Sequence, residues 1–506
     1  MASHRILLST SRSLDAARAW GSAMSTLVSR GHSIVQVSAR QPNSLQSEFL
    51  ANAYSMPRNI RDLVDRRNKV SPEALVSFDA YRGQREYPRT HATLLLMMSR
   101  VDSTGSFRSL EREVMIRQLH LEIHHALEVS RPTIAIFDVT PHEAMDYALL
   151  KVLEFRGIPT LMFQPSLVGP QVMARSSIAD ILPVPRKTEN YSGNREAFSA
   201  VVSIADASIK RLQVGTGTPK MDAQKQKENQ VGSFISRIRA IAGSVERLKT
   251  PGRDAGFALT GHGHIGPRTR RFLEIFLERS LRRTLREKIK SLPNVTQAPK
   301  NRYVLMALHY EPERSSIPEG FPFDSQLDAV VAARNLLPED VELLVKEHFS
   351  QQAAALRGFV GRSPDFYDLV GDLPGIRMLG TQSATRRRMQ NADCVVTLTG
   401  KVGIEAAFEG IPVLYLGQPW WRGLPGSRHI SEVQDFEHFI ATNKPDRRDV
   451  EHWLSHQVRE VLIPGVSSVP PDRHSRRIAQ LPTGFEELEA EGIVASFDSL
   501  ASRQEA

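Results

Sequence analysis

Short apolar runs alternate along the first half of the chain with longer segments whose apolar residues recur at helical spacing. The apolar runs predict four strands, at Arg5–Ser9, Ser33–Ala39, Thr133–Val139 and Thr160–Gln164. The helical spacing predicts helices at Ser13–Arg30, at Glu111–Val129 and from about His142 to Phe155. Strands without a polar face, separated by helices, are typical of a parallel α/β sheet. A polar and aromatic tract, Ser77–Arg89, is predicted to be a long loop.

The second half repeats this alternation. Strands are predicted at Tyr303–Leu308, Val341–Val345, Ile376–Leu379, Cys394–Leu398 and Pro412–Leu416. Helices are predicted at Asp324–Leu336, Thr385–Asn391, Glu432–Ala441 and Asp446–Val461. Pro293 ends the preceding helix, and the segment Pro293–Lys300 is predicted to be a hinge. We therefore expect two Rossmann-like α/β domains that face each other across a cleft, at 1–292 and 301–480, and a helix with a frayed tail at 481–506.

Composition narrows the class of protein. The chain has 506 residues, a net charge of +9 and one cysteine, so an intramolecular disulfide is impossible. No run of 18 apolar residues occurs, which predicts a protein without a membrane-spanning helix, in the cytoplasm. The positive charge favours acidic partners such as nucleotide phosphates or anionic lipids. Nucleic acid is disfavoured because the basic residues do not interleave with aromatic ones.

The segment Pro267–Leu292 predicts a basic amphipathic helix. Its apolar stripe includes Phe272, Ile275 and Leu285, and nine Lys or Arg residues occupy the rest. Such a helix can lie on an anionic membrane surface, which would make the protein peripheral at the inner face of the membrane. The alternative is that the stripe packs on its own domain.

The stretch Ala392–Gly417 carries the most specific local signal. It predicts a strand, a turn containing Thr399, Gly400, Lys401 and Gly403, a short helix and a second strand. A helix N-terminus after a glycine turn offers N–H groups and a positive dipole end to a phosphate. Glu405 lies in the first turn of this helix, within reach of a ribose or sugar hydroxyl. An ordinary strand–helix connection is the alternative interpretation.

Polar residues also follow three other predicted strands. Lys346, Glu347 and His348 come directly after one strand of the second half, and His309 follows another. In the first half, Asp138 lies near the end of the strand Thr133–Val139, and His142 and Glu143 follow it, which makes the three residues candidate acid–base groups. A solvated strand end and an acidic helix start are the structural alternatives.

The histidines of GHGHIG, 261–266, lack nearby cysteine or carboxylate ligands, so we expect no metal site. No cofactor is expected either.

Three motifs of the second half resemble a known family. The segments ALHYEPERSSIPEGFPFDSQLDAVV, LLVKEH and TLTGKVGIEAAFEGIPVLYLG resemble the second domain of bacterial capsule and surface-polysaccharide glycosyltransferases, including Kdo transferases. DVTPHEAMDYALLKVLEFRGIPTLMFQPS resembles the matching part of their first domain. The resemblance covers about 133–164 and 303–417. Two positions depart from the pattern: Phe349 replaces a proline, and Lys401 replaces a hydroxyl residue.

The resemblance implies a two-domain GT-B fold, with a nucleotide-sugar donor, such as CMP-Kdo, on the second domain and a glycan or lipid-linked acceptor on the first. On this hypothesis Lys346 and His348 contact the donor phosphates, with Glu347 and His309 beside them, and His348 protonates the leaving group. Gly400, Lys401 and Gly403 hold the phosphate. His142 or Asp138 activates the acceptor. A nucleotide-sugar epimerase of the same shape and a non-catalytic nucleotide-binding subunit are the alternatives.

Overall fold

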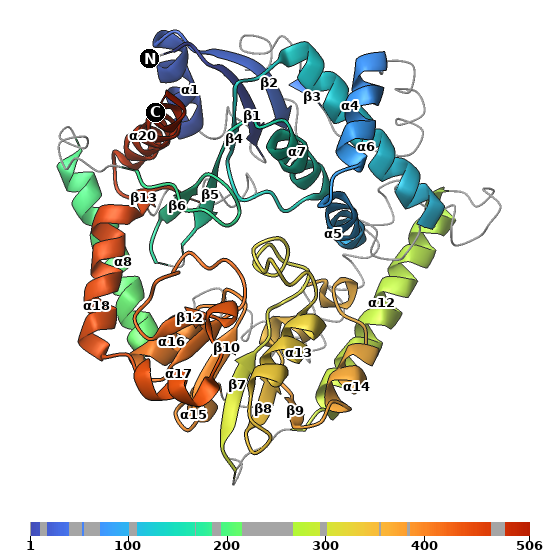
Figure 1. Cartoon of the computed structure of the whole chain (residues 1–506), viewed down its shortest axis with the longest axis vertical. Helices are drawn as coiled ribbons and strands as arrows, with labels where there is room; N and C mark the ends of the chain where they lie inside the picture. Colours follow the sequence, from blue (N-terminus) through green and yellow to red (C-terminus); the bar gives the residue numbers. More distant parts are fainter. Residues whose placement is uncertain are drawn as a thin grey trace. The chain divides into compact units, whose positions relative to one another are not determined.

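The computed structural model in Figure 1 divides the chain into two compact units. It describes residues 2–10, 18–39, 53–54, 71–100, 109–166, 168–184, 194–214, 267–293, 301–353, 356–381, 385–466 and 481–505. Unit 1 comprises Met1–Leu94, Val114–Lys210 and His452–Ala506. Unit 2 comprises Leu95–Glu113 and Arg211–Glu451.

Unit 1 contains a seven-stranded sheet in the order β13-β6-β5-β4-β1-β2-β3. Its parallel strands are β1 (Arg5–Thr10), β2 (Ser33–Ala39), β3 (Ala53–Tyr54), β4 (Ile134–Phe137) and β5 (Thr160–Pro165). Two antiparallel strands extend one edge, β6 (Gln171–Arg175) and β13 (Ile463–Pro464). Ser9 of β1 pairs with Phe137 of β4, so these two strands end side by side.

Seven of the described helices lie wholly or mostly in unit 1. They are α1 (Arg18–Ser29), α4 (Pro72–Arg82), α5 (Tyr87–Ser99), α6 (Ser109–Ser130), α7 (Ala144–Phe155), α8 (Arg195–Val214) and α20 (Phe485–Glu505). Figure 1 shows α1 and α20 side by side, and alternate strand residues such as Ile6 and Leu8 pack with them into one core cluster. This period of two is the spacing of side chains on one face of a strand. The C-terminal helix is therefore part of the core of unit 1.

Unit 2 contains a six-stranded parallel sheet in the order β12-β11-β10-β7-β8-β9. The strands are β7 (Tyr303–Ala307), β8 (Glu342–Lys346), β9 (Ile376–Leu379), β10 (Cys394–Thr397), β11 (Val413–Tyr415) and β12 (Ser427–His429). Ala307 pairs with Lys346 and Met306 with Val396, so β7, β8 and β10 end at the same edge. The residues that follow these three strands must leave the sheet close together.

Seven of the described helices lie in unit 2, and the last of them ends in unit 1. They are α12 (Pro267–Ser291), α13 (Gln326–Leu336), α14 (Asp365–Gly371), α15 (Thr385–Met389), α16 (Val402–Phe408), α17 (Phe436–Thr442) and α18 (Arg447–His456). Short 3-10 turns occur at η3 (Phe349–Gln352), η4 (Gly358–Val360) and η5 (Ile430–Glu432), and a π turn, η6 (Gln457–Val461), follows α18 into unit 1.

The basic helix α12 uses its apolar stripe within its own unit. Leu285 and Ile289 are buried in the core cluster of unit 2, and Lys288 forms an ion pair with Asp368. The guanidinium of Arg282 lies 5.3 Å from the ring centroid of Phe359. Phe276 remains 60% exposed. The structure therefore supports the packing alternative for Ile275, Leu285 and Ile289, whereas Leu281 is exposed like Phe276, and contact with a membrane stays a prediction.

The prediction of two parallel-sheet α/β domains is confirmed, but several details differ. Ser77–Arg89 is not a loop, because its residues belong to α4 and α5. The helix α12 falls in unit 2, whereas the sequence placed 267–292 in the first domain. Residues 452–466 and α20 fall in unit 1, so the second domain does not extend to 480 and the last helix is not a separate tail. The edge strands β3, β12 and β13 and the inner strand β6 were not predicted.

Two sequence-based features lie outside the described residues, the GHGHIG segment at 261–266 and most of the proposed hinge at 293–300. Among the helices that the structure describes, none is long and apolar enough to cross a bilayer. The described residues also contain no group of three His, Cys, Asp or Glu side chains placed to hold a metal ion.

Two neutral histidines in α6 should make unit 1 sensitive to acid. Burial lowers the pKa of His120 from 6.5 to about 4. Burial and the charge of Arg156 lower the pKa of His124 from 6.5 to about 3. Below pH 6.5 the unfolded chain binds more protons than the folded one, so stability is lost as the pH falls from 6.5 towards 4.

We predict that opening of α6 becomes easier by up to about 1.4 kcal/mol per pH unit for each histidine. Hydrogen exchange of α6 peptides, measured between about pH 7 and pH 5 and corrected for intrinsic rates, checks this. His120→Phe should reduce the pH slope. An equal slope in wild type and variant would contradict the assignment.

Candidate functional site

The residues that follow β7, β8 and β10 form the most developed polar site of unit 2. His309 lies two residues beyond β7, Glu347 and His348 follow β8, and Thr399 lies two residues beyond β10. Three of these sequence-predicted groups are buried, namely His309, Glu347 and Thr399. The parallel register brings them together although they are up to 90 residues apart in the chain.

The imidazole of His309 is hydrogen-bonded to the strand end of β10. The N–H of Thr399 donates to its Nε2 over 3.2 Å, and the Thr397 hydroxyl lies 3.2 Å from the same atom. Because Nε2 accepts, the neutral ring carries its hydrogen on Nδ1, which lies 3.3 Å from Ser315 Oγ. Burial, and next the charge of Arg362, lower the pKa of His309 to about 4. His309 is thus a neutral group that joins β7 to β10.

The imidazole of His348 has the opposite tautomer. The Ser350 N–H donates to its Nδ1 over 3.2 Å at the start of η3, so the neutral ring carries its hydrogen on Nε2. Burial lowers the pKa of His348 to about 3, with further contributions from His309, Lys346, Arg362 and Lys401. Without a ligand His348 is therefore a neutral hydrogen-bond donor. Protonation of a leaving group by this side chain would require an anion nearby to raise its pKa.

The electrostatics of His348 also connect it with Lys401. Lys401 begins α16 and pairs with Glu405 over 2.8 Å. The side chain of Lys346 is buried at the end of β8, where Nζ donates to the Glu347 carbonyl. Positive charge from three basic residues therefore acts on one imidazole at the carboxyl edge of the sheet.

The glycines of the turn after β10 pack against protein atoms. A Cβ on Gly403 would lie 2.6 Å from the Trp421 ring, and one on Gly400 would lie 2.8 Å from Thr397 Oγ1. The N–H of Gly400 donates to Thr397 Oγ1 and that of Gly403 to the Gly400 carbonyl. Three of the N–H groups proposed for a phosphate, those of Thr399, Gly400 and Gly403, thus already have protein acceptors. The lysine side chains are the stronger candidates for that role.

Glu347 belongs to a buried ion-pair network that sequence reasoning missed. Its Oε2 lies 2.6 Å from Arg362 Nη1 and accepts the Tyr367 hydroxyl over 2.7 Å, while Oε1 accepts the His348 N–H over 2.5 Å. The side chain is 0% exposed. This carboxylate therefore supports the site from behind, and the direct donor contact proposed from the sequence is not what its position favours.

In unit 1, the predicted acid–base groups lie where β1 and β4 end. Asp138 is buried and accepts the Thr10 hydroxyl over 3.2 Å, and Asp146 accepts the Ser9 hydroxyl over 3.0 Å. His142 Nδ1 lies 3.0 Å from the Thr140 carbonyl, which can only accept, so the neutral ring has its lone pair on Nε2.

That lone pair gives His142 the tautomer of a general base, and Nε2 lies 3.9 Å from Glu143 Oε1. Glu143 is the N-cap of α7 by its extended backbone conformation, and its side chain makes no capping hydrogen bond. Asp146, Ser9 and Thr10 were not predicted. The sequence signal that could have indicated Asp146 is its position one helical turn after His142.

Comparisons with known proteins add context without deciding the function. No protein-family model matches the chain, and no curated protein matches it. The solved structures that are similar include a β-Kdo 2,7 transferase, KpsC of Thermosulfurimonas dismutans, at 16% identity and TM-score 0.22, covering 40% of this chain and 60% of that chain. This chain thus spans less than two thirds of the length of that relative.

Two further similar structures represent different activities. A β-Kdo 2,4 transferase from the same organism matches at 11% identity and TM-score 0.24, over 63% of this chain and 87% of that chain. A UDP-GlcNAc 2-epimerase from Methanocaldococcus jannaschii matches at 11% identity and TM-score 0.21, over 94% of this chain and 99% of that chain. Likenesses at these scores carry no argument about the activity of this chain.

The two site histidines should be neutral at ordinary pH in the ligand-free protein. Their lowered pKa values, about 4 for His309 and about 3 for His348, predict that neither imidazole gains a proton as the pH falls from 7 to about 5. NMR of protein with ¹⁵N-labelled histidine checks this, with His309→Asn and His348→Asn to assign the signals. A titration midpoint near 6.5 for either ring would contradict the site geometry.

Proposed function

We propose that the protein is a glycosyltransferase. In this proposal unit 2 binds the nucleotide part of an activated sugar, and unit 1 supplies the group that activates the acceptor. The sugar passes to a capsule or other surface-polysaccharide acceptor. The sequence resemblance of 303–417 to surface-polysaccharide glycosyltransferases supports the choice of reaction, with CMP-Kdo as the first donor to test.

One observation carries the proposal. Lys346 ends β8, Lys401 begins α16 after β10, and the charges of both lysines act on His348, so two ammonium groups and one N–H donor gather at the edge where β7, β8 and β10 end. Ligands of open α/β sheets bind outside the carboxyl ends of the strands. A site of this charge favours an anion, and the phosphate of a nucleotide sugar is an anion that the reaction class supplies.

The same groups suit the chemistry of sugar transfer. As the bond between the sugar and the phosphate breaks, negative charge grows on the departing nucleotide. Cations and N–H donors fixed beforehand in a largely buried site stabilise that charge without reorganisation. His348 donates through Nε2–H, and Lys346 and Lys401 contribute their charges. Glu405, paired with Lys401, would orient it and accept a hydroxyl of the donor.

The proposed acceptor step uses unit 1. His142 carries its lone pair on Nε2 and would remove the proton of the acceptor hydroxyl, while the neighbouring Glu143 stabilises the imidazolium that results. Asp138 is the second candidate for this role. Attachment to an anionic membrane through α12, which would bring the protein to a lipid-linked acceptor, remains part of the proposal.

Nucleotide binding should depend on the unit 2 groups. Relative to wild type, we predict that His348→Ala and Glu405→Ala weaken the binding of CMP or CMP-Kdo about tenfold or more, because each removes a hydrogen bond to a charged ligand or its partner. Calorimetry measures the dissociation constants. His438→Ala, at an exposed histidine on α17, is the matched control and should bind like wild type. Unchanged affinity in both site variants would contradict the proposed donor site.

Acceptor activation should depend on unit 1 alone. We predict that His142→Ala leaves nucleotide affinity unchanged and lowers the transfer rate by about 10²–10⁴-fold, the usual loss for an acid–base group. Transfer is measured as release of free nucleotide in the presence of acceptor. Loss of nucleotide binding in folded His142→Ala would show that the units are assigned to the wrong substrates, and an unchanged rate would move the role to Asp138 or Glu143.

The same assay separates the alternative functions. An epimerase would convert a free nucleotide sugar without an acceptor, and the epimerised product would be detected by NMR. A non-catalytic subunit would bind nucleotide and release no product. Either result would replace the glycosyltransferase proposal while leaving the donor site in place.

A further inference from the structure

The backbone between β7 and the turn that follows is held by two glutamine side chains. Gln326 accepts the His309 N–H over 2.7 Å and donates to the His309 carbonyl over 3.1 Å. Gln351 accepts the Glu311 N–H over 2.9 Å and donates to the Glu311 carbonyl over 3.0 Å. Each glutamine amide therefore pairs with the N–H and the carbonyl of one residue, as a neighbouring strand would, and the two residues paired in this way are His309 and Glu311.

Arg362 adds a third support from a more distant part of the chain. Its Nη2 lies 2.8 Å from Glu311 Oε2 and 3.3 Å from the His309 carbonyl, and its Nη1 lies 2.6 Å from Glu347 Oε2. The guanidinium carbon lies 4.4 Å from the ring centroid of Phe366. With 1% of its side chain exposed, Arg362 cannot contact a bound substrate.

The loop that carries Arg362 approaches the His309–Glu311 segment very closely. A Cβ on Gly361 would lie 2.5 Å from the Glu311 carbonyl carbon, a distance that real Cβ atoms do not show. Only glycine permits this contact. The close approach of the two backbones therefore places Arg362 within reach of the Glu311 carboxylate, and the ion pair holds the backbones together.

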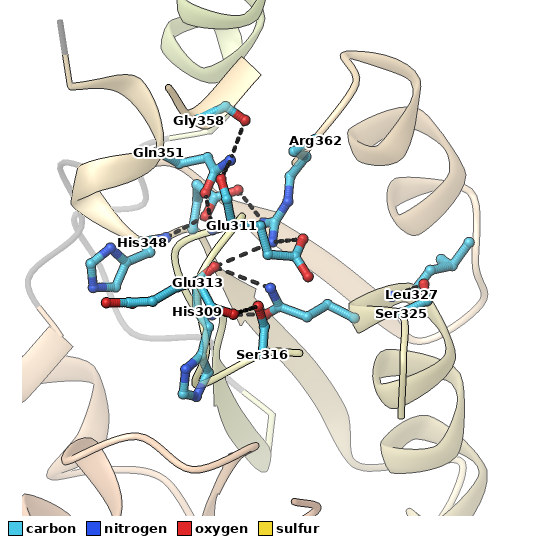
Figure 2. A network of polar contacts seen from close by, with 12 residues as sticks. His309, Glu311, Glu313, Ser316, Ser325, Leu327, His348, Gln351, Gly358 and Arg362 are labelled. Atoms are coloured by element: carbon cyan, nitrogen blue, oxygen red, sulfur yellow. Dashed lines mark hydrogen bonds and ion pairs between the residues drawn. The ribbon is translucent and has the colours of Figure 1, made fainter. Parts of the chain in front are cut away.

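The network extends from Arg362 to both site histidines. On one side Arg362 binds the carbonyl of His309. On the other it binds Glu347, whose second oxygen accepts the His348 N–H. In the view of Figure 2 the two imidazoles project from this network on the side away from Arg362. One buried guanidinium thus connects the backbones from which both rings project.

We infer that Arg362 is a positioning residue of the proposed nucleotide site. By binding the His309 carbonyl, Glu311 and Glu347 together, it fixes the loop after β7 against the loop after β8, and with them the places of the two imidazoles. The inference deepens the proposed function and rests on it for its effect on nucleotide binding. Its effect on the imidazoles does not require a ligand.

Arg362→Lys tests the inference because lysine keeps the charge but cannot reach three acceptors with a planar fork. In the ligand-free variant we expect the imidazole ¹⁵N signals of both His309 and His348 to move. We expect nucleotide affinity to fall at least tenfold. Arg357→Lys is the matched control, since Arg357 pairs with Glu278 near the same loop but is half exposed. The control should change neither readout.

A merely structural role predicts a different pattern. The variant would then unfold at a lower temperature, with both imidazole signals and the affinity per folded molecule unchanged, and that result would overturn the inference. If Arg362→Lys does not fold, Tyr367→Phe replaces it, because it removes one hydrogen bond to Glu347. It should move the signals of His348 and leave those of His309 in place, and unmoved His348 signals would count against the network.

The two proposals fail separately. If wild type binds no nucleotide, the proposed function is wrong, while the imidazole signals of the ligand-free variants still decide the role of Arg362. If wild type binds nucleotide and Arg362→Lys binds it equally well with unchanged imidazole signals, the proposed function stands and the positioning role is wrong.

Discussion

The buried guanidinium of Arg362 is the interaction on which the candidate site of unit 2 depends. It pairs with two carboxylates, Glu311 and Glu347, that follow adjacent strands and would otherwise repel each other in a medium of low dielectric constant. Attraction to Glu347 and Glu311 outweighs the cost of burial and raises the pKa of Arg362, so it stays charged. Such a network adds little net stability when complete, but removing one partner costs about 3–5 kcal/mol. It therefore specifies a geometry more than it stabilises the fold.

Around this network, the site divides its groups between structure and chemistry. His309 is hydrogen-bonded on both ring nitrogens to protein atoms, which makes it a connection between β7 and β10. The turn glycines leave room for Trp421 and for Thr397, and the ring of Trp421 also donates to the Thr399 carbonyl. The groups that the proposal assigns to a ligand are the side chains of His348, Lys346 and Lys401. The binding energy of an anion would thus come from charge and from one neutral donor, with the glycine turn as scaffold.

The central strands could be predicted from the sequence, and so could the location of the site residues at the carboxyl ends of these strands, because both follow from local patterns. A strand buried on both faces is a continuous apolar run, as at Cys394–Thr397, and parallel strands of one sheet end at one edge. The strands β3, β12 and β13 were missed because they are only two or three residues long, and β6 was missed because Gln171 and Arg175 interrupt its apolar pattern. Arg362 was missed for a different reason: its partners lie 15 and 51 residues away, and no local pattern marks a buried arginine. The filling of the glycine turn by Trp421 is equally non-local.

The most direct test of the account is a crystal structure of the protein with a bound nucleotide, CMP first. The account predicts the phosphate beside the Nε2 of His348 and the ammonium groups of Lys346 and Lys401, at the edge where β7, β8 and β10 end. Arg362 should remain buried between Glu311 and Glu347 without touching the nucleotide. A phosphate bound away from these three side chains, or bound directly by Arg362 after the network opens, would contradict the account.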